Sequence, residues 1–315
     1  MRSAVISAPG RVELVEGRVD RVGSGSVLVD VEGCGVCGSN LPVWEGREWF
    51  DYPLPAGNPG HEAWGRVADA GDTELQVGQR VALLAENAFT EQLVVPVERC
   101  VALPPELDGQ PFPGEAIGCA FNAVRRSGIE PGQTVAVVGV GFLGALIVAL
   151  AAEAGARVIA LARKESALDL ARQLGAKETV VLDDHQRAIG AVSDLTGGDF
   201  CERVVEVTGA PWPLDVAGEL TGFGGRLVIA GFHQDGLRPV NVQLWNWRGI
   251  DVVNAHERDP AVQLRGIREA VDAVASGRLD PRPLYTHLYP LDRLGDAMDA
   301  AAQRPDGFVK ALVAR

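Results

Sequence analysis

The chain has 315 residues, of which 47% are hydrophobic and 23% charged, and its formal net charge is −13. This composition is typical of a folded protein of about two domains with a full apolar core. The acidic balance argues against nucleic acid or an anionic membrane as a partner, because phosphate binding needs clustered Lys and Arg. The sequence contains no run of ~18 apolar residues, so no membrane span is predicted.

The first 114 residues are rich in Gly, Pro and Val and predict a small, mostly β domain. The segment Met1–Ile6 has a strand-like pattern and lacks the apolar core of a signal peptide. Five scattered cysteines do not resemble a disulfide framework, so we expect a reducing, cytoplasmic compartment. Alternating apolar residues predict further strands at 27–32, 64–70, 79–84 and 91–95.

Strands and helices then alternate, which predicts an α/β fold with a doubly wound parallel sheet. The expected domains are 1–114, a dinucleotide-binding domain at 115–255, and a return to the first domain at 256–315. Helices are predicted at 114–127, 143–153, 165–174, 186–195, 214–220, 261–276 and 291–303. Strands are predicted at 134–138, 157–161, 178–182, 202–207, 225–230, 250–254 and 308–313.

A glycine-rich turn joins the first strand and helix of the alternating region. Its Gly-x-Gly-x-x-Gly pattern consists of Gly139, Gly141 and Gly144. The first glycine allows a tight turn, the second lets a pyrophosphate approach the backbone, and the third lets the helix pack on the strand. The pattern therefore predicts a dinucleotide site at this helix N-terminus. Further candidates for contact with the coenzyme are Phe142, Leu143 and Thr208.

The end of the second strand bears on the choice of coenzyme. An acidic residue there would hold the ribose hydroxyls of NAD, but the sequence has Ala162, Arg163 and Lys164. Two cations are suited to a 2′-phosphate, so we expect NADP, with NAD as the alternative. The alternative interpretation is that Arg163 and Lys164 are solvated residues at a strand end with no ligand.

Two short segments of the first domain carry metal-ligand residue types. Cys37 lies in a Gly-Val-Cys-Gly-Ser segment, and His61 and Glu62 follow Gly60. Thiolate, imidazole and carboxylate are the ligands that zinc prefers. The spacing alone is equally consistent with Cys37 as a buried core cysteine and His61 as a hydrogen-bonded core histidine. Cys34 and Cys37 also form a Cys-x-x-Cys pair, but no thioredoxin-like context surrounds it.

These segments, a Gly-Gln-Arg-Val at 78–81 and the glycine turn resemble the zinc-containing medium-chain alcohol and polyol dehydrogenase family. The similarity runs over almost the whole chain, including 279–310. It implies a Rossmann domain beside a mostly β, GroES-like catalytic domain, and an enzyme that moves hydride between a nicotinamide coenzyme and an alcohol, polyol or ketone. It also implies a homodimer or homotetramer.

The resemblance assigns roles to individual residues. Cys37 and His61 match zinc ligands, and Glu62 matches a carboxylate that ligates zinc or exchanges with solvent. Ser39 matches the hydroxyl that relays the proton of the substrate alcohol. Glu115, 24 positions before Gly139, fits the remaining ligand better than Cys119. Lys310 matches a basic residue that contacts the coenzyme pyrophosphate, with a solvated strand lysine as the alternative.

The chain also departs from the family. Asn40 replaces a usual Asp that strengthens the histidine ligand, so Asn40 is expected to weaken it. Pro42 replaces a relay histidine found in some members. The four-cysteine lobe that holds a structural zinc is missing, so one zinc ion is expected.

The substrate pocket is weakly specified, and its candidate residues are equally typical of packing. We consider two rival functions, a zinc-free quinone or enoyl reductase and a catalytically decayed NADP(H)-binding protein. The candidates that follow the first ligand are Trp44, Trp49, Phe50 and Tyr52. A second group at the domain crossover would suit a polyol, cyclitol or sugar, and it consists of His233, Trp245, Asn246, Trp247, Asn254 and His256.

Overall fold

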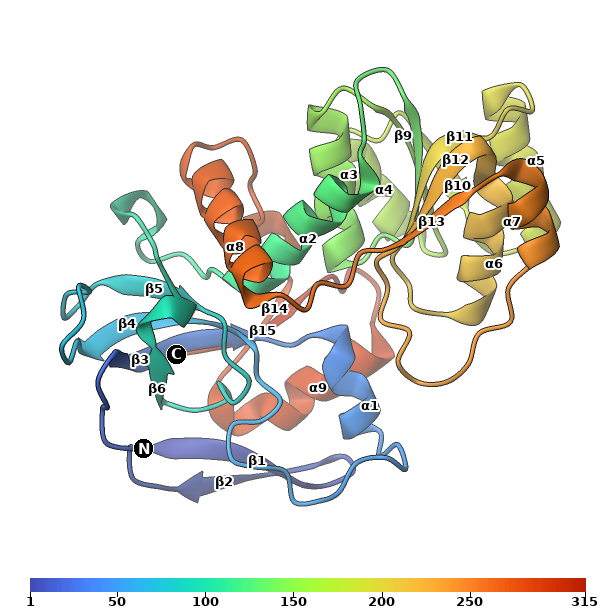
Figure 1. Cartoon of the computed structure of the whole chain (residues 1–315). Helices are drawn as coiled ribbons and strands as arrows, with labels where there is room; N and C mark the ends of the chain where they lie inside the picture. The colour runs from blue at the N-terminus through green and yellow to red at the C-terminus, as the bar shows by residue number, and fades with distance from the viewer. The chain divides into compact units, whose positions relative to one another are not determined.

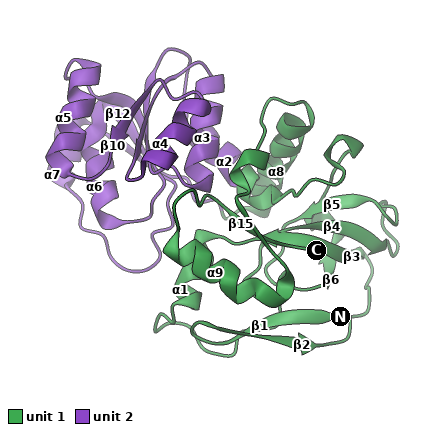
Figure 2. Ribbon diagram, turned by 180° about the vertical axis from the view of Figure 1, so that it is seen from behind, with its two compact units in different colours: residues 1–118, 258–315 green, residues 119–257 purple.

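The computed structural model describes residues 1–315 and divides into two compact units. Unit 1 comprises residues 1–118 and 258–315, and unit 2 comprises residues 119–257 (Figure 2). Helix α2 (Gly114–Ser127) crosses the boundary between them. The predicted α/β class, with a parallel sheet in one part and a mostly antiparallel sheet in the other, is confirmed. No helix combines the length and apolar composition that crossing a bilayer needs.

Unit 1 is built on a seven-stranded sheet with β3 (Ser26–Gly35) near its middle (Figure 1). The strand order is β14-β15-β3-β4-β5-β7, and β6 also pairs with β3. Val27, Val29 and Val31 alternate along β3 and are buried in the core, as a half-buried strand requires. The other elements are β1 (Arg2–Ala8), β2 (Arg11–Glu16), α1 (Leu41–Trp44), β4 (Glu62–Asp69), β5 (Arg80–Leu83), β6 (Gln92–Pro96), β7 (Cys100–Ala102), α8 (Pro260–Ala275), β14 (His287–Tyr289), α9 (Leu294–Gln303) and β15 (Ala311–Ala314).

The end of the chain returns to the middle of this sheet. β15 pairs antiparallel with β3, so that Leu312 lies opposite Gly35 and Val313 opposite Cys34. This pairing brings Lys310, just before β15, close to the end of β3. The residues that follow β3 and those that precede β15 therefore share one region of unit 1.

Unit 2 contains a parallel sheet of six strands in the order β10-β9-β8-β11-β12-β13. The order reverses between β8 and β11, which is where ligands bind in doubly wound folds. Helices cover both faces of this sheet (Figure 1). The strands are β8 (Thr134–Val138), β9 (Arg157–Ala162), β10 (Glu178–Val181), β11 (Cys201–Glu206), β12 (Thr221–Ile229) and β13 (Asp251–Asn254). The helices are α3 (Phe142–Glu153), α4 (Glu165–Gln173), α5 (His185–Thr196), α6 (Pro211–Leu220) and α7 (Val242–Arg248).

The central strand β8 is buried on both faces. Ala136 and Val138 join the core cluster formed with α5 and α6, whereas Val137 lies on the side of Gly144 in α3. A strand enclosed by helices on both sides must be apolar throughout, which explains the run Val135–Val138.

The sequence prediction missed β2 and α7, and also the short elements α1, β7 and β14. β1 and β2 form a hairpin, and β2 carries the apolar and charged alternation Arg11–Glu16. Helix α7 begins where the Asn241 side chain accepts the Leu244 N–H and ends at Gly249 with φ of +61°. Both signals, an N-cap asparagine and a following glycine, are present in the sequence.

Candidate active site

Three metal-ligand side chains meet where β3 ends and β4 begins. Gly35 and Glu62 are partners in the antiparallel register, so Cys37 follows one strand and His61 precedes the other. The donor atoms of Cys37, His61 and Glu62 lie within 4.8 Å of one another. A side chain at Gly35 would come within 1.8 Å of a Glu62 carboxylate oxygen, so only glycine leaves room for it.

Backbone and amide groups fix the orientation of His61. Its Nδ1 lies 2.7 Å from the carbonyl oxygen of Pro59, which can only accept, so Nδ1 carries the proton. In the neutral ring Nε2 then carries the lone pair, 3.5 Å from Ser39 Oγ. Asn40 donates to the same Pro59 carbonyl at 3.2 Å and accepts the Cys37 N–H at 2.9 Å. A metal-binding histidine needs this arrangement, with its other nitrogen held by a carbonyl.

The electrostatic environment of His61 favours a cation. Burial by itself opposes the charged imidazole and lowers its pKa, but a hydrogen bond from the ring to Cys37 and the Cys37 charge act in the opposite direction. With the added influence of Glu115 and Glu62, the pKa of His61 is raised to about 10. A metal ion at this site would displace the proton on Nε2. The donor set and its spacing fit zinc.

Glu62 also forms a buried ion pair with Lys310. The Lys310 Nζ lies 2.7 Å from Glu62 Oε1 and 2.5 Å from Oε2, and both side chains are at most 5% exposed. Burial opposes the charge of Lys310, but the charge and hydrogen bond of Glu62, together with the charges of Cys37 and Glu115, outweigh it and raise the pKa of Lys310. This contact favours a role beside the metal ligands, and the predicted pyrophosphate contact stays a prediction. Sequence reasoning missed the pair because only the β3–β15 pairing brings its members together.

Two residues on α2, Glu115 and Cys119, are the candidates for the remaining ligand. Glu115 lies in the first turn of α2, is half-buried and helps to raise the pKa of His61, so its carboxylate influences the site. Neither Glu115 nor Cys119 belongs to the cluster within 4.8 Å. The preference for Glu115 therefore stays a prediction.

The glycine turn of unit 2 has the geometry that a dinucleotide site needs. Gly139 has φ of +105°, and a side chain there would meet Thr208 Cγ2 at 2.6 Å. A Cβ at Gly144 would lie 2.0 Å from the Gly139 carbonyl oxygen, so helix and turn pack at backbone contact. Gly141 is the N-cap of α3, forms no side-chain cap, and has nothing within 4 Å of a Cβ position. The backbone there is open to an anion.

The other predicted coenzyme residues surround this turn. Phe142 is buried and Leu143 half-buried at the start of α3. Arg163 and Lys164 are exposed at the carboxyl end of β9, and Lys164 is the N-cap residue of α4 without capping it by its side chain. The end of β9 carries no carboxylate in either position.

Four of the predicted substrate-pocket residues have structural partners. Trp44 is buried and donates to Asp299 at 2.9 Å, and Phe50 and Tyr52 pack on the core of unit 1. Trp245 packs against Gly218, where a Cβ would lie 2.5 Å from its Nε1. Trp247 is 76% exposed, and Trp49 is 49% exposed. Packing therefore accounts for Trp44, Phe50, Tyr52 and Trp245.

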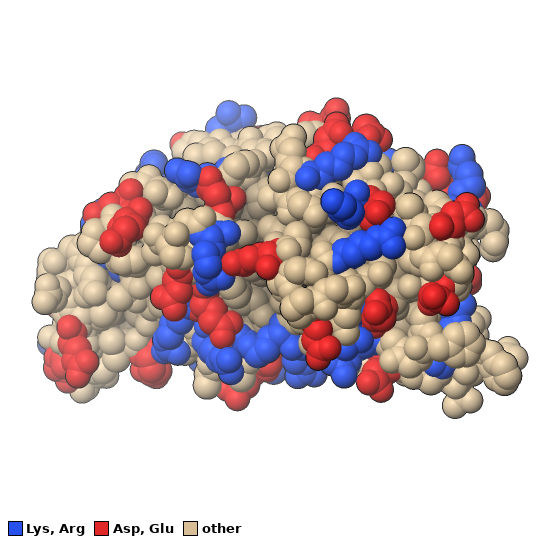
Figure 3. Space-filling model, turned by 90° about the horizontal axis from the view of Figure 1, so that it is seen from above, with Lys and Arg blue, Asp and Glu red and all other residues tan.

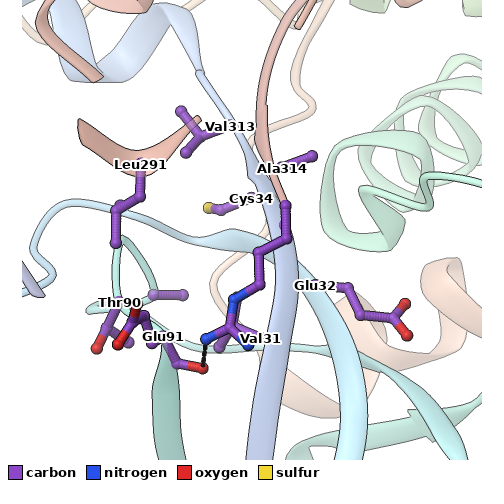
Figure 4. A pocket seen from close by; sticks show the side chains of 11 residues that line it. Val31, Glu32, Cys34, Thr90, Glu91, Leu291, Val313 and Ala314 are labelled. Atoms are coloured by element: carbon purple, nitrogen blue, oxygen red, sulfur yellow. Dashed lines mark hydrogen bonds between the residues drawn. The ribbon is translucent and has the colours of Figure 1, made fainter. Parts of the chain in front are cut away.

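Two hollows of unit 1 lie apart from the metal-ligand cluster. The cavity in Figure 4, lined by Val31, Cys34, Thr90 and Leu291 among others, has a volume of about 30 Å³. It is large enough for water and too small for a substrate. A more open groove of about 310 Å³ lies beside Trp44 and Arg293. Neither is lined by Cys37, His61 or Glu62.

A second group of metal-ligand residue types lies in unit 2, formed by His185, Asp215 and Glu219. The Trp212 indole donates to His185 Nδ1 at 3.2 Å, and Nε2 lies 3.0 Å from Glu219 Oε1. Because an indole can only donate, Nδ1 is the acceptor and the proton resides on Nε2. This tautomer makes the group a hydrogen-bonded link between α5 and α6.

Comparison with known proteins gives consistent matches over both units. Residues 23–105 match the alcohol dehydrogenase GroES-like domain, and residues 143–272 match the zinc-binding dehydrogenase domain. The chain is 26% identical to 2-dehydro-3-deoxy-L-galactonate 5-dehydrogenase of Pseudoalteromonas atlantica, with 95% of this chain and 94% of that protein covered.

Solved structures share the fold. An oxidoreductase/dehydrogenase of unknown specificity from Escherichia coli superposes with a TM-score of 0.89 at 20% identity, over 99% of this chain and 98% of the other. Alcohol dehydrogenase from Thermus sp. ATN1 superposes with a TM-score of 0.85 at 24% identity, over the full length of both chains. With both domain models matched in their expected places, the chain belongs to the medium-chain dehydrogenase/reductase family and is an NAD(P)-dependent dehydrogenase.

Proposed function

We propose that the protein interconverts a secondary alcohol or polyol and the corresponding ketone with NADP, using one zinc ion held by unit 1. The observation that carries this proposal is the cluster of Cys37, His61 and Glu62, whose donor atoms lie within 4.8 Å of one another. Pro59 accepts from His61 Nδ1, so Nε2 is the nitrogen that would bind the ion. In this proposal residues 1–114 and 256–315 form the catalytic domain, and 115–255 bind the dinucleotide.

Cys37 and His61 would hold the ion, and Glu62 or Glu115 would complete the set. When bound, zinc supplies Lewis acidity that lowers the pKa of an alcohol or polarises a ketone. Ser39 Oγ lies 3.5 Å from His61 Nε2, so its hydroxyl is placed to accept a proton from a substrate held there. Lys310 neutralises the Glu62 charge and so limits the negative charge around the ligands.

The coenzyme preference rests on the end of β9. Arg163 and Lys164 are exposed there, and neither position carries a carboxylate that would repel a 2′-phosphate. The N-terminus of α4 adds a favourable partial charge for an anion, which Glu165 in its first turn partly offsets. These features support NADP over NAD.

The substrate proposal is supported by the curated relative, which is named for a polyhydroxylated sugar acid. We therefore place polyols, sugars and sugar acids ahead of simple alkyl alcohols. The proposal also includes a reducing, cytoplasmic compartment, supported by cysteines that form no disulfide, and a homo-oligomer.

A coenzyme-coupled assay tests the function. Purified protein is supplied with NADP or NAD and a panel of alkyl alcohols, polyols and sugar acids. We expect turnover with NADP and a hydroxylated substrate. A clear preference for NAD would overturn the interpretation of Arg163. Coenzyme binding without turnover of any substrate would favour the decayed protein, and turnover of quinones or enoyl substrates alone would favour the zinc-free reductase.

A further inference from the structure

A buried carboxylate lies at the point where the strand order of unit 2 reverses. Glu206 ends β11, and its side chain is 0% exposed. A buried charge needs several hydrogen bonds to be tolerated. Glu206 receives four, from Thr208 N at 2.6 Å, Thr208 Oγ1 at 2.5 Å, Gly209 N at 3.0 Å and His233 Nε2 at 2.7 Å. The family resemblance assigned no role to this residue.

His233 and Arg238 connect this carboxylate to the loop after β12. Arg238 Nε donates to His233 Nδ1 at 3.1 Å. A guanidinium can only donate, so His233 accepts on Nδ1 and donates its Nε2 proton to Glu206. Arg238 Nη2 also donates to the Gly209 carbonyl at 3.3 Å and pairs with Asp235. The loop is thus attached to segment 206–209 at two points.

Segment 206–209 in turn contacts the glycine turn of the coenzyme site. Val207 N–H donates to the Val138 carbonyl at 3.0 Å, and the Thr208 methyl lies against Gly139. The loop after β12 packs so closely on segment 206–209 that neither Gly209 nor Gly231 has space for a side chain. A Cβ at Gly209 would lie 2.3 Å from the Phe232 carbonyl oxygen, and one at Gly231 would lie 2.3 Å from Gly209 N. The contacts therefore run unbroken from Arg238 to Gly139.

We propose that His233 and Arg238 are positioning residues for the coenzyme, acting through Glu206 on Thr208 and the glycine turn. This inference rests on the proposed function, because Gly139 and Thr208 matter to it as the predicted dinucleotide site. The pair keeps the loop at 231–241 against the carboxyl ends of β8 and β11. Loss of either member releases the loop there and lowers affinity for the coenzyme.

The test is the dissociation constant of NADPH, measured by nicotinamide fluorescence on the whole protein. His233→Phe removes both hydrogen bonds, and Arg238→Gln leaves Glu206 with all four donors, so it stays informative if His233→Phe folds poorly. We expect each to raise the dissociation constant roughly tenfold, the scale of one lost hydrogen bond to a charged group. His233→Gln keeps a donor for Glu206 and is expected to retain most of the affinity.

Arg157→Gln is the matched control. Arg157 also binds a carboxylate, Glu178, and a carbonyl, that of Leu195, but it begins β9 at the opposite end of the sheet. We expect it to leave the dissociation constant unchanged. Wild-type affinity in both His233→Phe and Arg238→Gln, or an equal loss in Arg157→Gln, would overturn the inference while the function stands. Failure of the wild-type protein to bind NADPH or NADH would instead overturn the function on which it rests.

Discussion

Asn40 holds two backbone groups of the candidate metal site at once. Its amide donates to the Pro59 carbonyl, which also accepts from His61, and it accepts the Cys37 N–H. From the sequence we expected Asn40 to support the histidine ligand less well than an Asp would. In the structure, Asn40 contacts His61 only indirectly, through the Pro59 carbonyl that both side chains share. The amide has both a donor and an acceptor, and a carboxylate would have only acceptors.

Asn40→Asp introduces the residue that is usual in the family, but here we expect it to weaken the metal site. The carboxylate cannot donate to Pro59, so we expect zinc affinity to fall roughly tenfold, the low end for outer partners of metal ligands. Competition with a chromophoric chelator measures this. Asn122→Asp is a matched control, because Asn122 is also buried and its Oδ1 accepts from Arg125. Unchanged zinc affinity in Asn40→Asp would contradict the account.

The ion pair between Lys310 and Glu62 predicts a large effect on stability. Lys310→Met leaves a buried, unpaired carboxylate, so the metal-free protein should lose roughly 3–5 kcal/mol of unfolding free energy. Replacing Glu62 by Leu in the same chain should recover most of the loss. Urea denaturation measures both. A Lys310→Met protein as stable as the wild type would refute the buried pair. So would a double variant with an unfolding free energy no higher than that of Lys310→Met.

At the scale of elements, the alternation of β8, the glycine turn and α3 could be predicted from the sequence. The apolar run and the three glycines specify local structure, and α2 was predicted with the bounds that the structure has. The cluster of Cys37 and His61 was found through family resemblance, since residue spacing alone left a buried cysteine equally plausible. The Lys310–Glu62 pair and the Glu206 network depend on strand order and loop packing, which local patterns do not encode.

The glycine turn allows binding and stability to be separated. Gly144→Ala places a methyl group 2.0 Å from the Gly139 carbonyl, so we expect a loss of about 1–3 kcal/mol in unfolding free energy. Gly141→Ala meets nothing within 4 Å and should fold normally, while its methyl group obstructs the approach of a pyrophosphate. Thermal unfolding and NADPH titration distinguish the two. A Gly141→Ala protein with full NADPH affinity would argue against binding at this turn.

At the scale of the molecule, charge and exposed apolar groups limit the choice of partner. Acidic and basic side chains are interspersed on the face shown in Figure 3, with a net charge of −13 for the chain. β13 is an edge strand with Val252 42% exposed, and α7, which leads into it, exposes Val242 and Trp247. An open apolar edge is a template for pairing with a second copy of the same strand.

We therefore expect a homodimer that pairs through β13. Light scattering should give about twice the chain mass of 33.3 kDa for the wild type. Val252→Lys places a charge on the edge and should give the monomer mass. Val181→Lys is the control, since Val181 is 43% exposed on the opposite edge strand, β10. A monomeric wild type, or dissociation by the control alone, would rule out this interface.

Zinc content measured together with turnover in Cys37→Ala tests the central claim most directly. Cys100→Ala is the matched control, a half-buried thiol of unit 1 outside the cluster. The account predicts one zinc ion per chain and turnover in the wild type and in Cys100→Ala, and neither in Cys37→Ala. Turnover that persists in zinc-free Cys37→Ala would contradict it.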